Sequence, residues 1–193
     1  MLISRISFVF LAFLLTGAGS AQAAPLNLAL QTPDIFTSFQ NTNYDAVTDI
    51  FTVDGFTQNV DGVSTGGGSF SLTATITAGG TLTSGTISIT GLSNTLISGD
   101  LFRVGFANNG SQVLEFLFTP TGGDLLAAYN PLLRNGGIIL SVSGYNDDNF
   151  NTSFSETNFG AFSDTAPVPV PAAVWLFGSG LLGLLGFTKR ARI

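Results

Sequence analysis

Residues 69–77 have the sequence Ser69-Phe70-Ser71-Leu72-Thr73-Ala74-Thr75-Ile76-Thr77. Apolar side chains alternate without a break with serine and threonine, so one side of an extended chain is apolar and the other is polar. This period of two is typical of an antiparallel strand that packs one face against a core and exposes the other to water. The stretch therefore predicts a β-strand whose phenylalanine, leucine, alanine and isoleucine point inward.

Two further stretches alternate in the same way and flank a strong turn signal. Residues 101–106 and 112–118 each place three apolar side chains on one face: Phe102, Val104, Phe106, Leu114, Phe116 and Phe118. The Asn-Asn-Gly sequence at 108–110 suits a tight turn, because asparagine and glycine tolerate positive φ. We expect a hairpin here. Glu115, an acid in the middle of an apolar strand, is expected on the outer face, paired with Arg103 across the hairpin.

Shorter stretches of the same kind recur between glycine-containing turns, at 26–30, 35–39, 49–53, 86–90 and 138–143. Many short strands at this spacing predict an all-β fold, an antiparallel β-sandwich or jelly-roll-like domain. One short helix is expected at 125–129, where Asp124 can cap its start and Pro131 can end it.

Phenylalanine is the dominant aromatic residue, with 18 copies against one tryptophan and three tyrosines. Most of these rings are expected to fill the core. Four of them lie in a polar stretch near the end of the exported region: Phe150, Phe154, Phe159 and Phe162. For these four, two interpretations stay open: a packed last strand, or exposed rings that stack on sugars.

The first 23 residues are typical of a secretory signal peptide. Arg5 provides the positive charge, residues 6–15 are apolar, and Ala21-Gln22-Ala23 has the A-x-A form of a cleavage site. We expect export through the Sec translocon and cleavage by signal peptidase after Ala23, so that the exported chain begins at Ala24.

The end of the chain consists of an apolar span followed by a basic tail. No charged side chain occurs between Ala166 and Thr188, and Val170–Phe187 would form a helix of about eighteen residues, roughly 27 Å, close to the hydrocarbon thickness of a bilayer. Trp175 suits a membrane interface. The tail residues Lys189, Arg190 and Arg192 suit a cytoplasmic stop-transfer signal. The sequence thus predicts a single transmembrane helix with the preceding domain outside.

This C-terminus resembles the PEP-CTERM sorting signal in its VPxPA-type form. The motif residues are Val168, Pro169, Val170, Pro171 and Ala172, and the span that follows contains Trp175-Leu176-Phe177-Gly178-Ser179-Gly180-Leu181. The resemblance implies recognition by exosortase, a membrane-embedded transpeptidase-like enzyme that removes the anchor and releases or attaches the protein at the cell surface. Carriers are typical of Gram-negative bacteria that make exopolysaccharide and biofilm. Val170 replaces the acid of the Pro-Glu-Pro form. A plain stop-transfer anchor is the alternative.

These observations divide the chain into four parts: a signal peptide at 1–23, a β domain at 24–156, a linker at 157–167, and the sorting signal with its transmembrane helix and basic tail at 168–193. All 12 acidic residues lie between the two terminal signals, whereas only Arg103 and Arg134 of the six basic residues do. Such an acidic surface repels nucleic acid and anionic lipid. Because the chain has no cysteine, no disulfide frames the fold.

The residues needed for most catalytic chemistry are missing. The chain has no histidine and no cysteine, and its one lysine is Lys189 in the tail. This excludes Ser-His-Asp triads, cysteine nucleophiles, Schiff-base lysines and Cys/His zinc sites. We therefore expect a protein that is not an enzyme and has no resident cofactor.

Calcium is the one ligand that a local pattern suggests. Asp147, Asp148 and Asn149 lie in a stretch that crowds oxygen ligands of the kind calcium prefers. The alternative is an ordinary polar turn. A looser set of acids, Asp45, Asp49, Asp54 and Asp61, is a weaker candidate for a loop cluster.

Taken together, the sequence predicts an exported surface or extracellular-matrix protein. It would be anchored transiently in the inner membrane with its domain in the periplasm, and then processed by exosortase. The alternative is a surface module that binds glycan or calcium and is held by a plain C-terminal anchor. Exopolysaccharide is a possible partner of either kind of protein, and nucleic acid of neither.

Overall fold

The computed structural model describes residues 24–106, 112–129, 135–142, 145, 150–156 and 162–168. Over these residues the elements are β1 (Ile35–Asp45), β2 (Ile50–Val60), β3 (Val63–Ser64), β4 (Ser69–Thr77), β5 (Thr81–Thr90), β6 (Thr95–Phe106), β7 (Val113–Gly122), α2 (Leu126–Tyr129), β8 (Asn135–Ser141), β9 (Phe154–Glu156) and β10 (Phe162–Val168).

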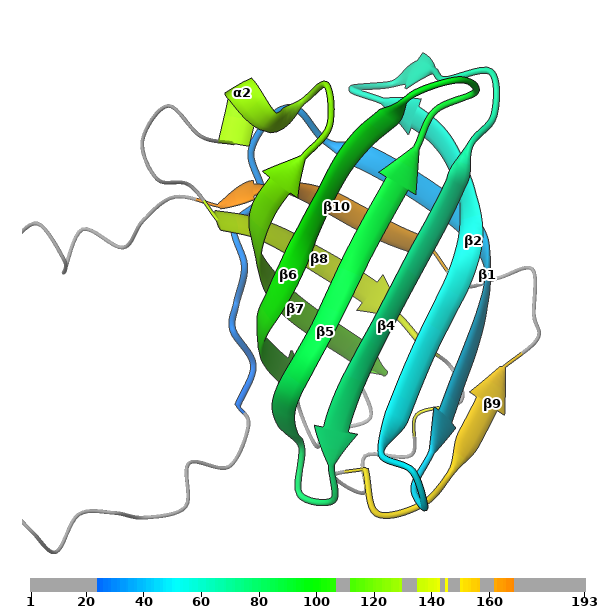
Figure 1. The fold of residues 1–193 in the computed structure, drawn as a ribbon, viewed down its shortest axis with the longest axis vertical. Coiled ribbons are helices and arrows are strands. Elements are labelled where there is room, and N and C mark those ends of the chain that lie inside the picture. The colour runs from blue at the N-terminus through cyan, green and yellow to red at the C-terminus, as the bar shows by residue number, and fades with distance from the viewer. Residues whose placement is uncertain are drawn as a thin grey trace, which may run out of the picture.

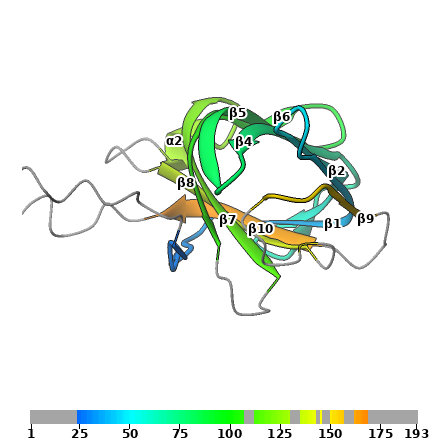
Figure 2. The same ribbon diagram turned by 90° about the horizontal axis from the view of Figure 1, so that it is seen from below.

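The strands form one antiparallel sheet that closes on itself. Their hydrogen-bonded order is β3-β2-β4-β5-β6-β7-β8-β10-β1-β9, and β1 also pairs with β2. Eight of these strands, from β2 through β10 to β1, therefore make a closed barrel, and β3 and β9 extend the sheet beside it. Figure 1 shows β4, β5 and β6 on the near wall with β8 and β10 crossing behind them, and Figure 2 shows the ring from below.

The all-β, antiparallel prediction is confirmed, but the strands make one closed sheet and not the two separate sheets of a sandwich. The ladders contain register shifts in the β1–β2, β4–β5, β5–β6 and β6–β7 pairs. Such bulges bend a strand and increase its twist, which is what a sheet needs to curl into a ring. Alternation alone does not reveal whether two apolar faces meet across a sandwich or across a barrel.

Most of the predicted local elements are present. β4 has the predicted bounds, α2 lies within the predicted helix, and β6 pairs with β7 as the hairpin required, with Val104 opposite Phe116. The prediction that Phe102 points inward is wrong, because its side chain is 47% exposed. The register of the β6–β7 ladder shifts between Leu101 and Arg103, and this shift places Phe102 on the outer face. Residues 26–30 were expected to form a strand, but they run outside the sheet ladders.

The predicted linker at 157–167 is also wrong in its second half. β10 occupies residues 162–168 and pairs with β8 on one side and β1 on the other, so it is part of the barrel wall. Its inward positions hold Ser163 and Thr165, both fully buried, in place of the large apolar residues that mark the other strands. The hydrophobic pattern therefore gave no strand signal here.

Among the residues described, no helix has the length and apolar character needed to cross a membrane. The predicted span at 170–187 and the predicted signal peptide at 1–23 both lie outside the described residues.

Aromatic rings fill the interior of the barrel. Phe51 of β2 stacks on Phe116 of β7 across the core, with ring centroids 5.8 Å apart and an interplanar angle of 21°. Phe70, Phe106 and Phe118 are buried as well. The prediction that phenylalanine fills the core is thus confirmed for these positions.

The two ends of the barrel are closed in different ways. At the end near β9, the fully buried Phe150 contacts three rings: Tyr44 at a centroid distance of 5.0 Å, and Phe106 and Tyr145 at 5.3 Å each. Phe106 and Tyr145 also contact each other, at 5.7 Å. Phe150 adopts a φ of 63°, which is unfavourable for a bulky side chain, so its burial must offset this local cost. At the other end, Tyr129 of α2 packs on Phe118 at 5.9 Å.

Of the four late phenylalanines, Phe150 and Phe154 are packed, with 0% and 8% of their surfaces exposed. The packed interpretation is confirmed for these two residues. Phe159 lies outside the described residues, and of Phe162 only the backbone is described.

Phe116→Ala tests the position of the core. Phe116 is fully buried, so its truncation should lower the free energy of unfolding by about 3–5 kcal/mol through lost burial and a residual cavity. Chemical denaturation followed by circular dichroism measures this change. The matched control is Phe56→Ala on β2, because Phe56 is 60% exposed and its truncation should cost much less. Equal costs for the two variants would show that the interior assignment is wrong.

Candidate functional site

The predicted site residues lie mostly outside the described part of the chain. This applies to Ala21 and Ala23 of the cleavage site, to Asp147, Asp148 and Asn149 of the calcium hypothesis, to Pro169, Val170, Pro171, Ala172 and Trp175 of the sorting motif, and to the tail residues Lys189, Arg190 and Arg192. The exception is Val168, the first residue of the sorting motif, which is the last residue of β10. Its neighbours in the fold therefore show what surrounds the start of that motif.

Residues 24–31 form an extended segment on the outside of the barrel, which we name the strap. Figure 1 shows this segment in blue beside the barrel wall. Glu115 on the outer face of β7 holds the strap by its carboxylate, which accepts three backbone N–H bonds: Leu26 N at 2.5 Å and Asn27 N at 3.1 Å donate to Oε2, and Leu28 N at 3.0 Å donates to Oε1. Three bonds to one ionised carboxylate are stronger than the same number between neutral groups.

Two glycines make room for the strap. A Cβ at Gly105 would lie 2.5 Å from Cγ of Leu26, and one at Gly137 would lie 3.1 Å from both Leu28 Cδ1 and Leu30 Cδ2. Side chains at these two positions would thus push the strap away from the sheet. The leucines at 26, 28 and 30 alternate as the sequence predicted, although the strap joins no ladder of the sheet.

The strap reaches the end of the last strand. Gln31 N donates to the carbonyl of Pro167 at 3.0 Å, and the Cβ position of Gly137 that contacts Leu28 and Leu30 lies 2.7 Å from Cγ1 of Val168. Val168 is only 7% exposed. The first residue of the sorting motif is therefore packed between β8 and the strap.

The predicted pairing of Glu115 with Arg103 is wrong. Glu115 does lie on the outer face, but Gly105 is opposite it in register and Arg103 is opposite Leu117. The carboxylate instead bonds the strap, and Glu115 is 8% exposed. The sequence signal that was available is the acid itself: an acidic residue in an apolar strand needs a partner, and here that partner is backbone that no side-chain pattern reveals.

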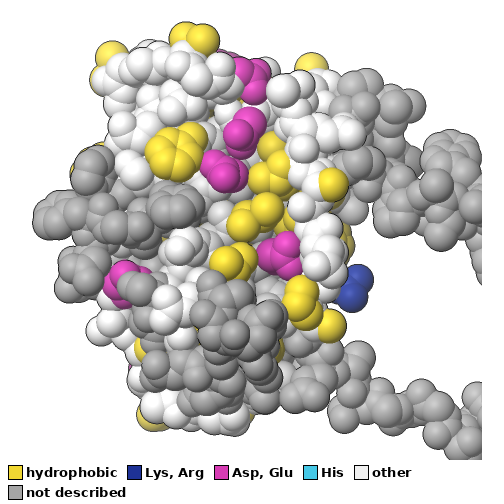
Figure 3. Space-filling view, turned by 180° about the vertical axis from the view of Figure 1, so that it is seen from behind, with side chains coloured by type: hydrophobic (Ala, Val, Ile, Leu, Met, Phe, Trp, Pro, Cys, Tyr) yellow, Lys and Arg dark blue, Asp and Glu magenta, His cyan; other side chains and the backbone are white. Residues whose placement is uncertain are grey.

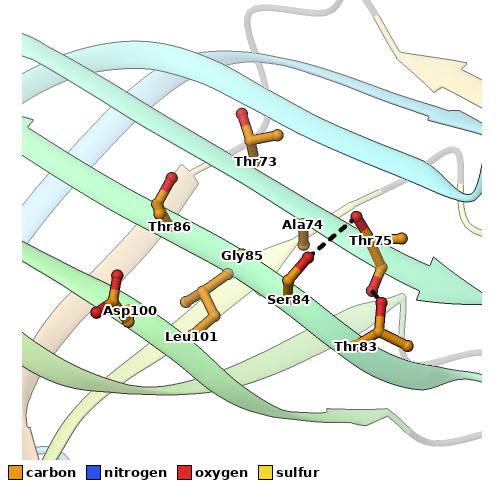
Figure 4. Close-up of a pocket in the computed structure, with 9 residues that line it drawn as sticks. All are labelled: Thr73, Ala74, Thr75, Thr83, Ser84, Gly85, Thr86, Asp100 and Leu101. Atoms are coloured by element: carbon orange, nitrogen blue, oxygen red, sulfur yellow. Dashed lines mark hydrogen bonds between the residues drawn. The ribbon is translucent and has the colours of Figure 1, made fainter.

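A groove of about 490 Å³ lies on the outer face of β4, β5 and β6. It is lined by Ala74, Gly85 and Leu101 together with five hydroxyl-bearing residues and one acid: Thr73, Thr75, Thr83, Ser84, Thr86 and Asp100. Figure 4 shows the oxygens of Thr73, Thr86 and Asp100 in a row across the three strands, which agrees with the register, since Thr86 pairs with both Thr73 and Asp100.

The groove combines hydroxyl groups and the Asp100 carboxylate with apolar surface, and none of its lining residues is cationic or aromatic. Part of its rim is held in place, because Ser84 Oγ donates to Thr75 Oγ1 at 3.3 Å and Thr83 Oγ1 donates to the Thr75 carbonyl at 3.2 Å. Hydroxyls both donate and accept, and a carboxylate accepts hydrogen bonds through both of its oxygens. This lining suits an uncharged ligand with many hydroxyl groups and disfavours an anion.

A second polar cluster is buried where the ring closes. Gln40 Nε2 donates to Thr37 Oγ1 at 2.6 Å and to Ser163 Oγ at 2.8 Å, and the two hydroxyls lie 2.6 Å apart. All three residues are fully buried. A Cβ at Gly55 would lie 2.6 Å from Cγ of Gln40, so glycine at that position is what lets the glutamine turn inward. The cluster joins β1 to β10 and has no reactive group.

Three acids come together where β1 begins. Asp34 N donates to Asp61 Oδ1 and Asp61 N donates to the Asp34 carbonyl, both at 2.8 Å, and Asp164 lies opposite Phe36 in the β1–β10 ladder. Figure 3 shows several acidic side chains among apolar ones on the face seen from behind Figure 1. Burial raises the pKa of Asp34, with further contributions from the charges of Asp164 and Asp61. Burial likewise raises the pKa of Asp164.

In the described ranges, no three acidic residues are arranged to hold a metal ion. The weaker calcium candidates are spread out: Asp45 and Asp49 flank the β1–β2 turn, Asp54 lies within β2, and Asp61 follows β2 at the other end of that strand. The Asp147–Asn149 hypothesis stays a prediction. Its flanking residues Tyr145 and Phe150 are both buried in the aromatic cluster.

No family model matches this chain, and neither a curated protein nor a solved structure matches it.

Asp34→Asn should stabilise the fold at neutral pH. A carboxyl with a raised folded-state pKa destabilises the fold when it is charged, and this cost disappears as the pH falls through the folded pKa toward the ordinary value. We expect Tm to rise by about 1–2 °C at pH 7, a small gain because solvent screens the site. The gain should vanish near pH 4.

The control is Asp54→Asn, which removes the same charge from an exposed position on β2. Thermal melts of both variants across this pH range separate the local effect from that of net charge. A lower Tm for Asp34→Asn, or equal shifts in both variants, would contradict the assignment.

Proposed function

We propose that this chain is an exported bacterial surface or extracellular-matrix protein whose β domain is delivered by C-terminal sorting and processing. The predicted signal peptide at 1–23 supports export across the inner membrane, and the resemblance of residues 168–193 to a sorting signal supports processing at the cell surface. The single structural observation that supports it best is the position of Val168: this residue ends the last strand of the folded domain and is also the first residue of the Pro-containing motif. Passive attachment, rather than catalysis, is the role that suits a barrel filled with aromatic side chains.

The processing step needs an extended substrate segment next to the membrane. Pro169 and Pro171 fix their own φ and disfavour helix at the residues before them. Neither can donate to a strand ladder, so strand pairing is disfavoured beyond Val168. Removal of the anchor breaks one peptide bond in this region, and the acyl part passes to the enzyme nucleophile and then to water or an amine acceptor. Because Val168 is buried, that bond should lie beyond Val168.

Replacing Pro169 and Pro171 together by alanine should let the membrane helix extend outward and slow the loss of the anchor. Mass spectrometry of the C-terminal peptides measures this in cells with and without exosortase, with Val170→Leu as the control that should have little effect. An intact 189–193 tail on surface protein in both strains would mean a plain anchor and refute the proposal.

The groove on β4–β6 supports a second candidate function, the binding of a neutral glycan. Its hydroxyls and Asp100 can bond the hydroxyls of a sugar, whereas the acidic domain and the absence of lining cations disfavour acidic polysaccharide. Since no aromatic ring lines the groove, we expect weak binding, with Kd on the order of 1 mM.

Titration with dextran oligosaccharides, followed by NMR or calorimetry, tests this candidate. Thr86→Val and Asp100→Asn should each weaken binding several-fold, and Thr95→Val, an exposed threonine at the start of β6, should not. Equal binding of alginate and dextran, or unchanged binding by both groove variants, would exclude the groove as a glycan site.

A further inference from the structure

The strap and the C-terminal strand meet on one face of the barrel. The strap covers the outer sides of β7 and β8, and its last residue bonds the carbonyl of Pro167. Ala166 and Val168, which lie in alternate positions of β10, are 0% and 7% exposed. Their surroundings include Gly137, which is opposite Ala166 in the ladder and whose Cβ position contacts Leu28, Leu30 and Val168.

The strap is fastened by few groups. Three backbone N–H groups bond Glu115, one bonds Pro167, and three leucines provide the apolar contact. It has no place in the sheet ladders, so it can leave without breaking any strand pairing. Segments of this kind open locally at lower free-energy cost than the strands beneath them.

We propose that the strap holds the C-terminal strand in place, a role we call the lock. When the strap is docked on the barrel, it buries Val168 and keeps residues 163–168 paired in the sheet. When the strap is released, residues 163–168 become exposed, and the segment that a processing enzyme can reach becomes longer. The effect on processing rests on the proposed function, whereas the effect on β10 does not. The predicted signal-peptide cleavage after Ala23 would make the strap the N-terminal segment of the exported chain.

Two variants release the strap by independent means. Glu115→Gln removes the charge that three N–H groups share, and Gly105→Ala places a methyl group 2.5 Å from Leu26 Cγ and 2.8 Å from the Ala24 carbonyl oxygen. The control is Gly122→Ala on β7, where a Cβ meets only Ser98 Oγ, at 3.0 Å.

Hydrogen exchange with mass spectrometry, on the full chain in detergent, reports directly on β10. Both release variants should speed exchange of the amides of residues 163–166 and 168 about tenfold, since exchange follows the free energy of local opening. Exchange in β4 should stay at the wild-type rate, as should all exchange in Gly122→Ala. If exchange at 163–168 is unchanged in the release variants, the strap does not hold β10 and the proposal is wrong. If exchange in β4 is accelerated equally, the variants destabilise the whole domain, and the proposal is wrong as well.

The same variants, expressed in cells that contain exosortase, test the processing effect. Anchor loss should be several-fold faster in Glu115→Gln and Gly105→Ala than in wild type and Gly122→Ala. Equal rates in all four proteins would overturn the control of processing by the strap. If no protein loses its anchor, the proposed function fails, and the exchange result still decides whether the strap locks β10.

Discussion

Closure of the sheet at β1 is the constraint on which the rest of the structure depends. This strand pairs with β2 along one side, and along the other with β10 over residues 35–38 and with β9 over residues 42–44. Between those two partners the β1–β2 register shifts, and Gln40 turns inward to bond Thr37 and Ser163. The seam is thus joined by polar bonds, whereas the opposite wall is joined by aliphatic and aromatic packing. Buried polar bonds are directional, so they select one register where apolar contacts would tolerate several.

The closed ring determines where everything else can lie. Since the aromatic rings fill the inside, any surface for a ligand or partner must be on the outer face or at the ends. The outer face divides into two regions of different chemistry. Over β4, β5 and the first part of β6 it is a hydroxyl-rich surface open to solvent, and over β7, β8, β10 and Gly105 of β6 it is covered by the strap. The chain thus uses the covered region for its own residues 24–31 and leaves the hydroxyl-rich surface beside Asp100 for contacts with its surroundings.

The sequence predicted the near wall of the barrel well and the seam poorly. β4, β6 and β7 alternate large apolar and polar residues, so period-two patterning located them, and the Asn-Asn-Gly sequence indicated that β6 and β7 form a hairpin. At the seam the inward residues are Thr37, Gln40, Ser163 and Thr165, which a hydrophobic pattern treats as solvent-facing. For this reason the hydrophobic pattern predicts a linker where the structure has β10. The bulge at Leu101–Arg103 makes the predicted orientation of Phe102 wrong for a related reason. One extra residue shifts the two-residue alternation of a strand, and the amino-acid composition does not reveal where the extra residue lies. Glu115 was recognised as unusual, but its partners are backbone N–H groups far away in the chain, and backbone carries no sequence signature.

The closing strands also bear on how the protein folds. Thr37 and Ser163, which meet at the seam, are 126 residues apart in the chain. Contacts between such distant residues give a high contact order, and the entropy lost in bringing them together slows folding. Strands β1 to β8 can pair with their sequence neighbours early, but that intermediate is a curled sheet with unpaired backbone along β1 and β8, the kind of edge that recruits other chains. The ring cannot be completed until residue 168 is free to join it, so delayed delivery of the last strand prolongs the state most prone to aggregation.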